Sequence, residues 1–355
     1  MMKLTSASLL VVFTCCVTLA VAAPQQPQNP IVGIVSEPVT HGECVSIYRS
    51  GLGVGDWNPL KTEKQLREFQ AQQQTAAPTR VPEANYSGCI WSLYVDWLEA
   101  SGIRVLPIPW DASNETLDSL LDGVNGVLLA GGILGWVPSL HEAYFKVAQR
   151  MYNNVMARNA RGDRLVLWGT CQGFEMINAA AAGTFDVVKH GYKGMEPLML
   201  SVNFTHWANE SAMYGAAPSD VLGYMSQENT TLNWHMYGVP PSEYTDNTQL
   251  NASGLRPLST TDDVTGRAFV SSVESSVAAI YAVQFHPERV MFQWDNDAIG
   301  HSRHAIEVSQ YLSLFLLEQL RESNHSFPTP QDAEQLLIAN YQRFNLGWGV
   351  RIYNV

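Results

Sequence analysis

The sequence predicts an α/β protein with a mostly parallel central sheet and helices on both of its faces. Along the first half of the chain, short apolar runs alternate with stretches that repeat apolar residues at helical spacing. This alternation is typical of parallel strands connected by crossover helices. The chain has 355 residues, 46% of them hydrophobic, which is enough for a substantial core in one large domain or two smaller ones.

The predicted elements begin with a buried strand at residues 31–35. A long insertion follows at residues 41–84, rich in Gly, Gln, Pro and Thr, in which residues 61–74 favour a short surface helix. The pattern then predicts strands and helices in alternation, with Gly102 at the end of the first helix. The strands are expected at 103–108, 126–130 and 165–168, and the helices at 89–101, 115–121, 141–157 and 174–182.

The second half of the chain looks richer in strands. Residues 197–285 favour β-structure and end in a strand at 278–285, after which residues 302–321 repeat apolar positions on one helix face. Residues 321–355 contain two prolines, a polar helix and an aromatic end. They are expected to form a tail packed on a domain that spans residues 23–320.

The N-terminus has the pattern of a secretory signal. Residues 1–22 carry an early lysine, an apolar run too short to span a membrane, and small residues at a cleavage site. A retained signal anchor is the alternative, and no later segment is apolar enough for a membrane span. Seven N-x-S/T motifs are candidate glycosylation sites on surface loops. They begin at Asn85, Asn114, Asn203, Asn209, Asn229, Asn251 and Asn324.

Charge and motifs exclude several classes of function. The formal net charge is -12 and no Lys/Arg cluster is present, which argues against a nucleic-acid partner. The sequence has no CxxC, HExxH, GxGxxG or P-loop motif, so neither a metal nor a cofactor is expected.

Removal of the signal leaves three cysteines, Cys44, Cys89 and Cys171. The simplest arrangement in an exported protein is a Cys44–Cys89 disulfide and a free Cys171. The alternative is that the first two are buried and reduced.

Cys171 lies in the strongest local motif. Residues 168–173 read Trp-Gly-Thr-Cys-Gln-Gly, between a predicted buried strand and a predicted helix. This is the layout of a nucleophile elbow, in which a tight turn exposes the side chain and glycines admit the substrate. The helix N-terminus is expected to lower the pKa of the thiol. The alternative is a buried structural cysteine on a strand-to-helix turn.

A cysteine nucleophile needs a histidine base that a third group orients. His286 follows the strand that ends at residue 285, at the sheet edge where open α/β proteins bind ligands. Glu288 is close enough to accept the other imidazole N–H. The alternative for His286 is a surface loop position.

Other residues are candidates for supporting roles. His235 is expected to bind substrate or assist proton transfer, and Glu175 lies one helical turn after Cys171. Glu175 could instead be a helix N-terminal charge stabilised by the dipole. The backbone N–H of Gln172 and one from Gly131 or Gly132 are candidate oxyanion donors.

These segments resemble the class I glutamine amidotransferase-like superfamily. Residues 168–175, Trp-Gly-Thr-Cys-Gln-Gly-Phe-Glu, and 284–288, Gln-Phe-His-Pro-Glu, carry the resemblance. Within the superfamily the chain most resembles the γ-glutamyl hydrolase family, which cleaves folylpoly-γ-glutamates. Further similar segments lie at residues 30–34, 94–102, 126–132 and 233–235, so that the match covers most of residues 30–320.

The resemblance implies a flavodoxin-like three-layer fold, with Cys171 as nucleophile, His286 as base and Glu288 as orienter. It also implies site roles for His235 and Glu175, export or delivery to a lysosome or vacuole, and a homodimer. The chain departs from the family in the 41–84 insertion and at residues 86–89 and 133–136, which are expected to alter recognition of the substrate tail.

The expected reaction is hydrolysis of a γ-glutamyl amide through a thioester on Cys171. A hydrolase of other γ-glutamyl amides or peptides would use the same site with a different outer pocket. A glutaminase subunit is disfavoured, because export would separate it from its synthase. A non-catalytic binding or storage protein on the same fold is the alternative from another class.

Overall fold

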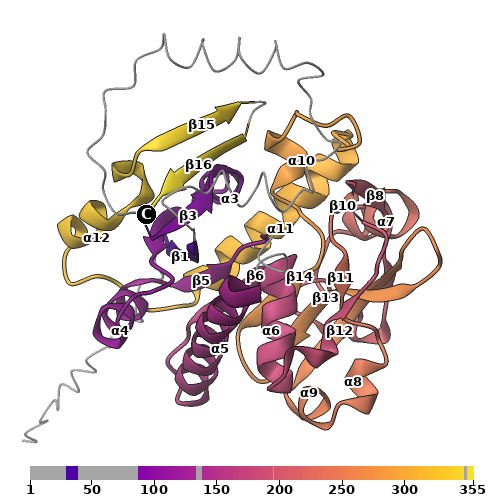
Figure 1. The fold of residues 1–355 in the computed structure, drawn as a ribbon, viewed down its shortest axis with the longest axis horizontal. Helices are drawn as coiled ribbons and strands as arrows, with labels where there is room; N and C mark the ends of the chain where they lie inside the picture. The colour runs from indigo at the N-terminus through magenta and orange to yellow at the C-terminus, as the bar shows by residue number, and fades with distance from the viewer. Residues whose placement is uncertain (1–28, 39–86, 133–137, 195, 348–349) are drawn as a thin grey trace, which may run out of the picture.

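The computed structural model describes residues 29–38, 87–132, 138–194, 196–347 and 350–355. The predicted signal peptide, the 41–84 insertion that contains Cys44, and Asn85 lie outside these residues. The described chain contains an eight-stranded sheet in the order β4-β1-β5-β6-β14-β13-β12-β9 (Figure 1). No helix in the described ranges is long and apolar enough to cross a membrane.

The first five strands of this sheet are parallel to their neighbours. Numbered along the chain, they lie in the order 2-1-3-4-5, which is the flavodoxin-like arrangement. The predicted α/β fold class with a mostly parallel sheet is therefore confirmed. These strands are β1 (Ile31–Val35), β4 (Arg104–Ile108), β5 (Gly126–Leu129), β6 (Val166–Thr170) and β14 (Ile280–Val283).

Three antiparallel strands extend the sheet beyond β14. They come from the region that the sequence predicts to be rich in strands, and two short antiparallel ribbons lie in the same part of the chain. The three strands are β13 (Ala268–Ser275), β12 (Leu255–Asp262) and β9 (Asn203–Phe204). The ribbons pair β8 (Leu198–Leu200) with β10 (Thr231–Asn233), and β7 (Lys189–His190) with β11 (Tyr237–Gly238).

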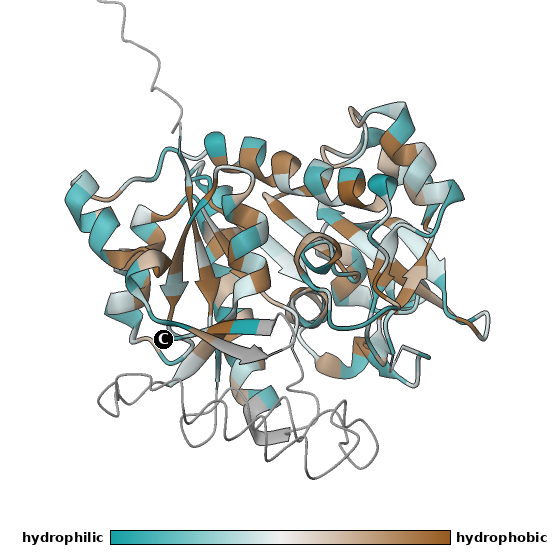
Figure 2. Ribbon diagram, turned by 90° about the horizontal axis from the view of Figure 1, so that it is seen from above, coloured by the Kyte–Doolittle hydropathy of each residue, from teal (hydrophilic) through white to brown (hydrophobic). Residues whose placement is uncertain are grey.

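Successive residues of the parallel strands point to two separate cores, one on each face of the sheet. In β5, for example, Val127 and Leu129 face one core and Leu128 the other. Figure 2 shows hydrophobic residues along the strands and on the inner helix faces. Helices of the first face are α3 (Ser92–Glu99), α7 (Ser219–Gln227) and α11 (Arg303–Arg321). Helices of the second face are α4 (Asn114–Gly123), α5 (Pro138–Ala160), α6 (Gln172–Ala182), α9 (Thr248–Ala252) and α12 (Pro330–Leu336).

The remaining elements are short. They are α8 (Glu243–Asp246), α10 (Arg289–Phe292), η2 (Phe185–Val187), η3 (His206–Glu210) and η4 (Ile338–Asn340).

The predicted helix at 89–101 is wrong in its first turn. Residues Gly88–Trp91 form strand β3, and the helix α3 begins only at Ser92. Cys89, Ile90 and Trp91 pair with β16, a strand from the far end of the chain. Local spacing cannot show such a partner, and tertiary pairing overrides helical propensity here. The resulting four-stranded sheet joins β3 to β2 (Glu37–Pro38), β15 (Arg343–Gly347) and β16 (Val350–Asn354).

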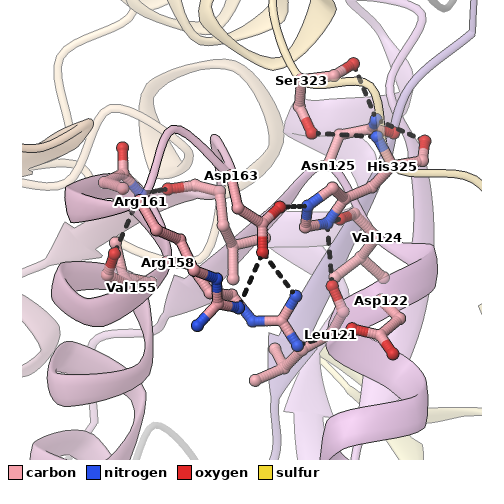
Figure 3. A network of polar contacts seen from close by, with 12 residues as sticks. Leu121, Asp122, Val124, Asn125, Val155, Arg158, Arg161, Asp163, Ser323 and His325 are labelled. Atoms are coloured by element: carbon pink, nitrogen blue, oxygen red, sulfur yellow. Dashed lines mark hydrogen bonds and ion pairs between the residues drawn. The ribbon is translucent and has the colours of Figure 1, made fainter.

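A polar network holds the start of the C-terminal segment against the sheet (Figure 3). The side chain of Asn125 accepts a hydrogen bond from the N–H of Ile31 and donates one to the carbonyl of His325. The His325 ring contacts the Asp163 carboxylate, which also pairs with Arg158. Since Asn125 directly precedes β5 and Ile31 begins β1, the network lies at the amino ends of the parallel strands.

Six of the seven candidate glycosylation asparagines fall within the described ranges, and all six are exposed. They are Asn114, Asn203, Asn209, Asn229, Asn251 and Asn324.

Candidate active site

The candidate residues meet at the carboxyl ends of the parallel strands. Cys171 follows β6, Gly131 and Gly132 follow β5, and His286 follows β14. Glu37 comes shortly after β1. Because parallel strands end at one edge of the sheet, residues far apart in sequence come together there, the usual place for a ligand in this class of fold.

Cys171 occupies a strained turn between β6 and α6. Its φ of 51° is the one positive value at a non-glycine position among the residues described. Its N–H donates to the carbonyl of Val283, and its own carbonyl accepts from the N–H of Glu175. A Cβ on Gly173 would lie 1.9 Å from the carbonyl oxygen of Leu129, so glycine is required for α6 to start this close to β5. This geometry is the predicted nucleophile elbow.

The buried His286 ring is held by Glu288. Its Nδ1 donates to Oε1 of Glu288 at 2.7 Å, and its backbone N–H donates to Leu232. The Arg289 Nε lies 3.4 Å from the same carboxylate oxygen. The Glu288 carboxylate is thus placed to orient the imidazole through Nδ1.

Cys171 and His286 approach one point beside the loop after β5. A Cβ on Gly131 would lie 3.0 Å from Cβ of Cys171, 2.8 Å from Cε1 of His286 and 2.7 Å from the Tyr94 hydroxyl. The carbonyl of Trp234 also lies at this meeting point, 4.0 Å from Sγ of Cys171 and beside the His286 ring. The structure therefore brings the candidate nucleophile, the candidate base and the glycine loop together.

The thiol and the imidazole are both held in their neutral forms. Burial, and then the Glu175 carboxylate, raises the pKa of the Cys171 thiol, although Arg289 and the N–H of Gln172 act against the rise. Burial lowers the pKa of His286, against the opposing effect of Glu288. The thiol pKa was expected to be lowered by the helix N-terminus; it is raised instead, because burial outweighs the lowering effects of Arg289 and the Gln172 N–H.

Two further buried carboxyls lie beside the nucleophile. Burial raises the pKa of Glu175 to about 8, and Glu175 accepts a hydrogen bond from Gln284 at 3.0 Å. Burial raises the pKa of Glu37 to about 8 as well. The Glu37 carboxyl lies against Gly132 and close to the Gln172 side chain. At neutral pH both groups hold a proton, so they add little negative charge to the site.

His235 lies next to the site, but its ring is engaged elsewhere. Nδ1 donates to the carbonyl of Tyr237 at 2.6 Å, Nε2 faces Asn233, and the ring edge packs on Phe269. Burial lowers the pKa of His235 to about 4. A neutral ring held on both sides is suited to shaping the pocket rather than to moving a proton.

The two glycines after β5 have different environments. The N–H of Gly131 donates to the Tyr94 hydroxyl at 2.7 Å, so it is not available to an oxyanion. The N–H of Gly132 has no partner within the described part of the chain. The N–H of Gln172 is directed at the Cys171 sulfur. Gly132 and Gln172 are thus the two candidate oxyanion donors.

Sequence reasoning missed Tyr94, Arg289 and Glu37 as site residues. Tyr94 was predicted only as part of an apolar helix face, and its hydroxyl reaches Gly131 through the fold. Arg289 directly follows Glu288, so its position was a usable signal. Glu37 lies two residues after the first apolar run, where the switch from apolar to charged residues was also a signal.

Comparison with known proteins places this site in a family. The profile of the Peptidase C26 family matches residues 69–288. The chain belongs to the Peptidase C26 family.

Relatives within Peptidase C26 are γ-glutamyl hydrolases. Gamma-glutamyl hydrolase B of Dictyostelium discoideum is 33% identical over 249 residues, which are 70% of this chain and 70% of that protein. The gamma-glutamyl hydrolases of Mus musculus and Homo sapiens are 33% and 30% identical, over 66% and 72% of this chain and 72% and 78% of their own lengths. These matches confirm the family resemblance, and the chain is a cysteine-type hydrolase of the γ-glutamyl hydrolase kind.

A solved structure is also similar over most of its length. The glutaminase domain of Trypanosoma brucei CTPS, with bound acivicin, has a TM-score of 0.42 at 13% identity. The alignment covers 84% of this chain and 96% of that one. The family assignment rests on the sequence matches and not on this similarity.

Proposed function

We propose that the protein hydrolyses the γ-glutamyl bonds of folylpoly-γ-glutamates through a γ-glutamyl thioester on Cys171. The observation that carries the proposal is the elbow thiol, buried together with a His286 that Glu288 orients. Several relatives bear the name gamma-glutamyl hydrolase, which supports the γ-glutamyl bond as the target.

The first half of the reaction forms the thioester. His286 takes the proton of Cys171 as the sulfur attacks the γ-carbonyl carbon, so that charge separation occurs only once substrate is bound. The N–H groups of Gly132 and Gln172 stabilise the developing oxyanion. The Glu288 carboxylate stabilises the imidazolium, which then protonates the nitrogen of the leaving amine as the C–N bond breaks.

The second half releases the product. His286, again neutral, takes a proton from a water molecule that attacks the thioester carbonyl. The same two N–H groups stabilise the second oxyanion. Its collapse breaks the C–S bond and returns the proton from His286 to Cys171, which restores the resting state.

The charge at the site suits an anionic substrate. The Arg289 guanidinium acts on the pKa of Glu37, Cys171 and Glu288. With Glu37 and Glu175 protonated, Arg289 and Glu288 carry the formal charges at the centre. Every γ-glutamyl residue of a polyglutamate has a free α-carboxylate, which a guanidinium can bind in bidentate fashion.

The proposed setting is export from the cell or delivery to a lysosome or vacuole, as a glycosylated homodimer. The apolar N-terminus and the six exposed acceptor asparagines support it. Cys89 is disulfide-bonded, which suits an oxidising compartment. Cys44 is the proposed partner and lies outside the described residues.

The proposal is tested by incubating purified protein with pteroylpenta-γ-glutamate and with γ-glutamyl-4-nitroanilide, and following products by chromatography. We expect shortened pteroylglutamates from the wild type and a loss of several orders of magnitude in Cys171→Ala with the fold intact. Cleavage of the anilide alone would favour a hydrolase of small γ-glutamyl amides. Tight binding without any cleavage would favour a non-catalytic protein.

A further inference from the structure

Tyr94 is a buried residue beside the reaction centre for which the mechanism above has no role. It lies on α3, with 1% of its surface exposed. Its hydroxyl oxygen accepts the N–H of Gly131 at 2.7 Å. The same oxygen meets Cys171 and His286 around the position where a Cβ of Gly131 would lie.

The hydrogen bond has a geometric consequence for the next peptide. Gly131 is the second residue after β5 and lies outside its ladder, so the sheet does not fix its N–H. The peptide between Gly131 and Gly132 can rotate unless something holds it, because glycine restricts the backbone least. The orientation of that loop decides where the Gly132 N–H points.

We propose that Tyr94 is a positioning residue of the hydrolase: by accepting the Gly131 N–H it fixes the loop so that the Gly132 N–H faces the carbonyl bound to Cys171. Tyr94 acts through Gly131 and not by direct attack or proton transfer. The role deepens the proposed function, since it requires acyl transfer at Cys171.

The pKa of the Tyr94 hydroxyl supports its role as a neutral hydrogen-bond acceptor. Burial, and then the Glu288 carboxylate, raises the pKa of Tyr94 well above its ordinary value. The group therefore stays a hydroxyl over the whole working range and never brings a negative charge next to the oxyanion. The ring belongs to the apolar core on this face of the sheet, so removal of the oxygen alone leaves the packing in place.

Tyr94→Phe is the decisive variant, and Tyr281→Phe is its matched control. Tyr281 is also a buried tyrosine, and its hydroxyl donates to the Gln319 side chain at 2.7 Å. Both variants keep the ring and lose the hydrogen bonds of the hydroxyl, so both should lose similar stability. We expect kcat to fall about 10- to 100-fold in Tyr94→Phe, with KM within about 2-fold, because one oxyanion donor is misplaced. Tyr281→Phe should keep the wild-type kcat.

The rate at which iodoacetamide alkylates Cys171 distinguishes a positioning role of Tyr94 from general damage to the site. This displacement forms no oxyanion, so its rate should stay within about 2-fold of wild type in Tyr94→Phe while kcat falls. A parallel loss of alkylation, or an unchanged kcat in Tyr94→Phe beside an active wild type, would overturn the role of Tyr94 alone. A wild type that cleaves no γ-glutamyl bond would overturn the proposed function together with it.

Discussion

At the residue scale, the site keeps its reactive groups neutral until substrate arrives. Burial raises the pKa of Cys171 and lowers that of His286, and it leaves Glu37 and Glu175 protonated at neutral pH. A resting thiol without charge is less exposed to oxidation than a thiolate, since the thiolate is the reactive form. In the proposed reaction, Glu288 stabilises the imidazolium that forms during attack.

Replacement of Glu288 by glutamine should therefore slow turnover and shift its pH dependence. We expect kcat to fall by about 10²-fold or more, because the imidazolium loses its counter-charge. Glu288 raises the pKa of His286, so its loss should move the acidic limb of the kcat/KM profile to lower pH. Glu334→Gln, at an exposed position, is the control. An unshifted acidic limb in Glu288→Gln would contradict the assignment of His286 as base.

The burial of Glu37 leads to a separate prediction about how stability depends on pH. Burial raises its pKa from the usual 4.5 to about 8, so the unfolded chain releases this proton at a lower pH than the folded protein does. The contribution to stability is fully present below pH 4.5 and is lost as the pH rises toward 8. Glu37→Gln should become more stable relative to the wild type across that window, by about 4 kcal/mol at pH 8.

Urea unfolding of wild type and Glu37→Gln at the two ends of this window measures the effect. Equal differences in free energy of unfolding at both pH values would show that Glu37 does not titrate as described.

At the element scale, the elbow depends on how closely α6 approaches β5. Gly173 is the residue that permits this approach, because its missing Cβ would clash with the backbone of Leu129. Gly223, in the middle of α7, has no atom within 4 Å of the equivalent position. The two glycines therefore provide opposite tests of one hypothesis. Glycine is required only where a neighbouring atom already occupies the position that a Cβ would take.

Gly173→Ala should displace α6, lower the free energy of unfolding by about 2–3 kcal/mol, and reduce turnover more than about 10-fold. Gly223→Ala should instead stabilise the protein by about 0.5–1 kcal/mol, because alanine is the better helix former, and leave turnover unchanged. Thermal unfolding and a turnover assay on the same samples check both. Full turnover in Gly173→Ala would contradict the described elbow.

The sequence predicted elements well where the signal was local. The turn around Cys171 and the segment from His286 to Glu288 each span only a few residues. The neighbouring apolar runs and glycines were therefore sufficient to predict them. Strand β3 could not be predicted, since its partner β16 lies at the opposite end of the chain. Tyr94 was missed for the same reason, because its function depends on a contact with Gly131 that only the fold creates.

At the scale of the whole molecule, the two ends of the parallel sheet have separate tasks. The carboxyl ends hold the site, and the amino ends hold the Asn125–His325 network that fastens the C-terminal segment (Figure 3). Changes at one end should therefore affect stability without affecting chemistry at the other.

Asn125→Ala tests this separation. It removes the acceptor for the Ile31 N–H and the donor to His325, which should cost about 2–4 kcal/mol in the free energy of unfolding. Turnover per folded molecule should stay at the wild-type value. Asn154→Ala is the control, since that side chain donates only to the carbonyl of Arg150 within its own helix. A fall in kcat for Asn125→Ala at full folding would refute the separation.

The order of the strands along the chain also determines when each site residue is synthesised. Cys171 follows strand β6. His286 follows the neighbouring strand β14, which begins only at Ile280. A ribosome that adds about 5–20 residues per second needs roughly ten seconds to travel between them. Throughout that interval the nascent chain holds a nucleophile with no base beside it. Since a thiol without its base cannot complete turnover, the nascent chain is expected to be inactive throughout that interval.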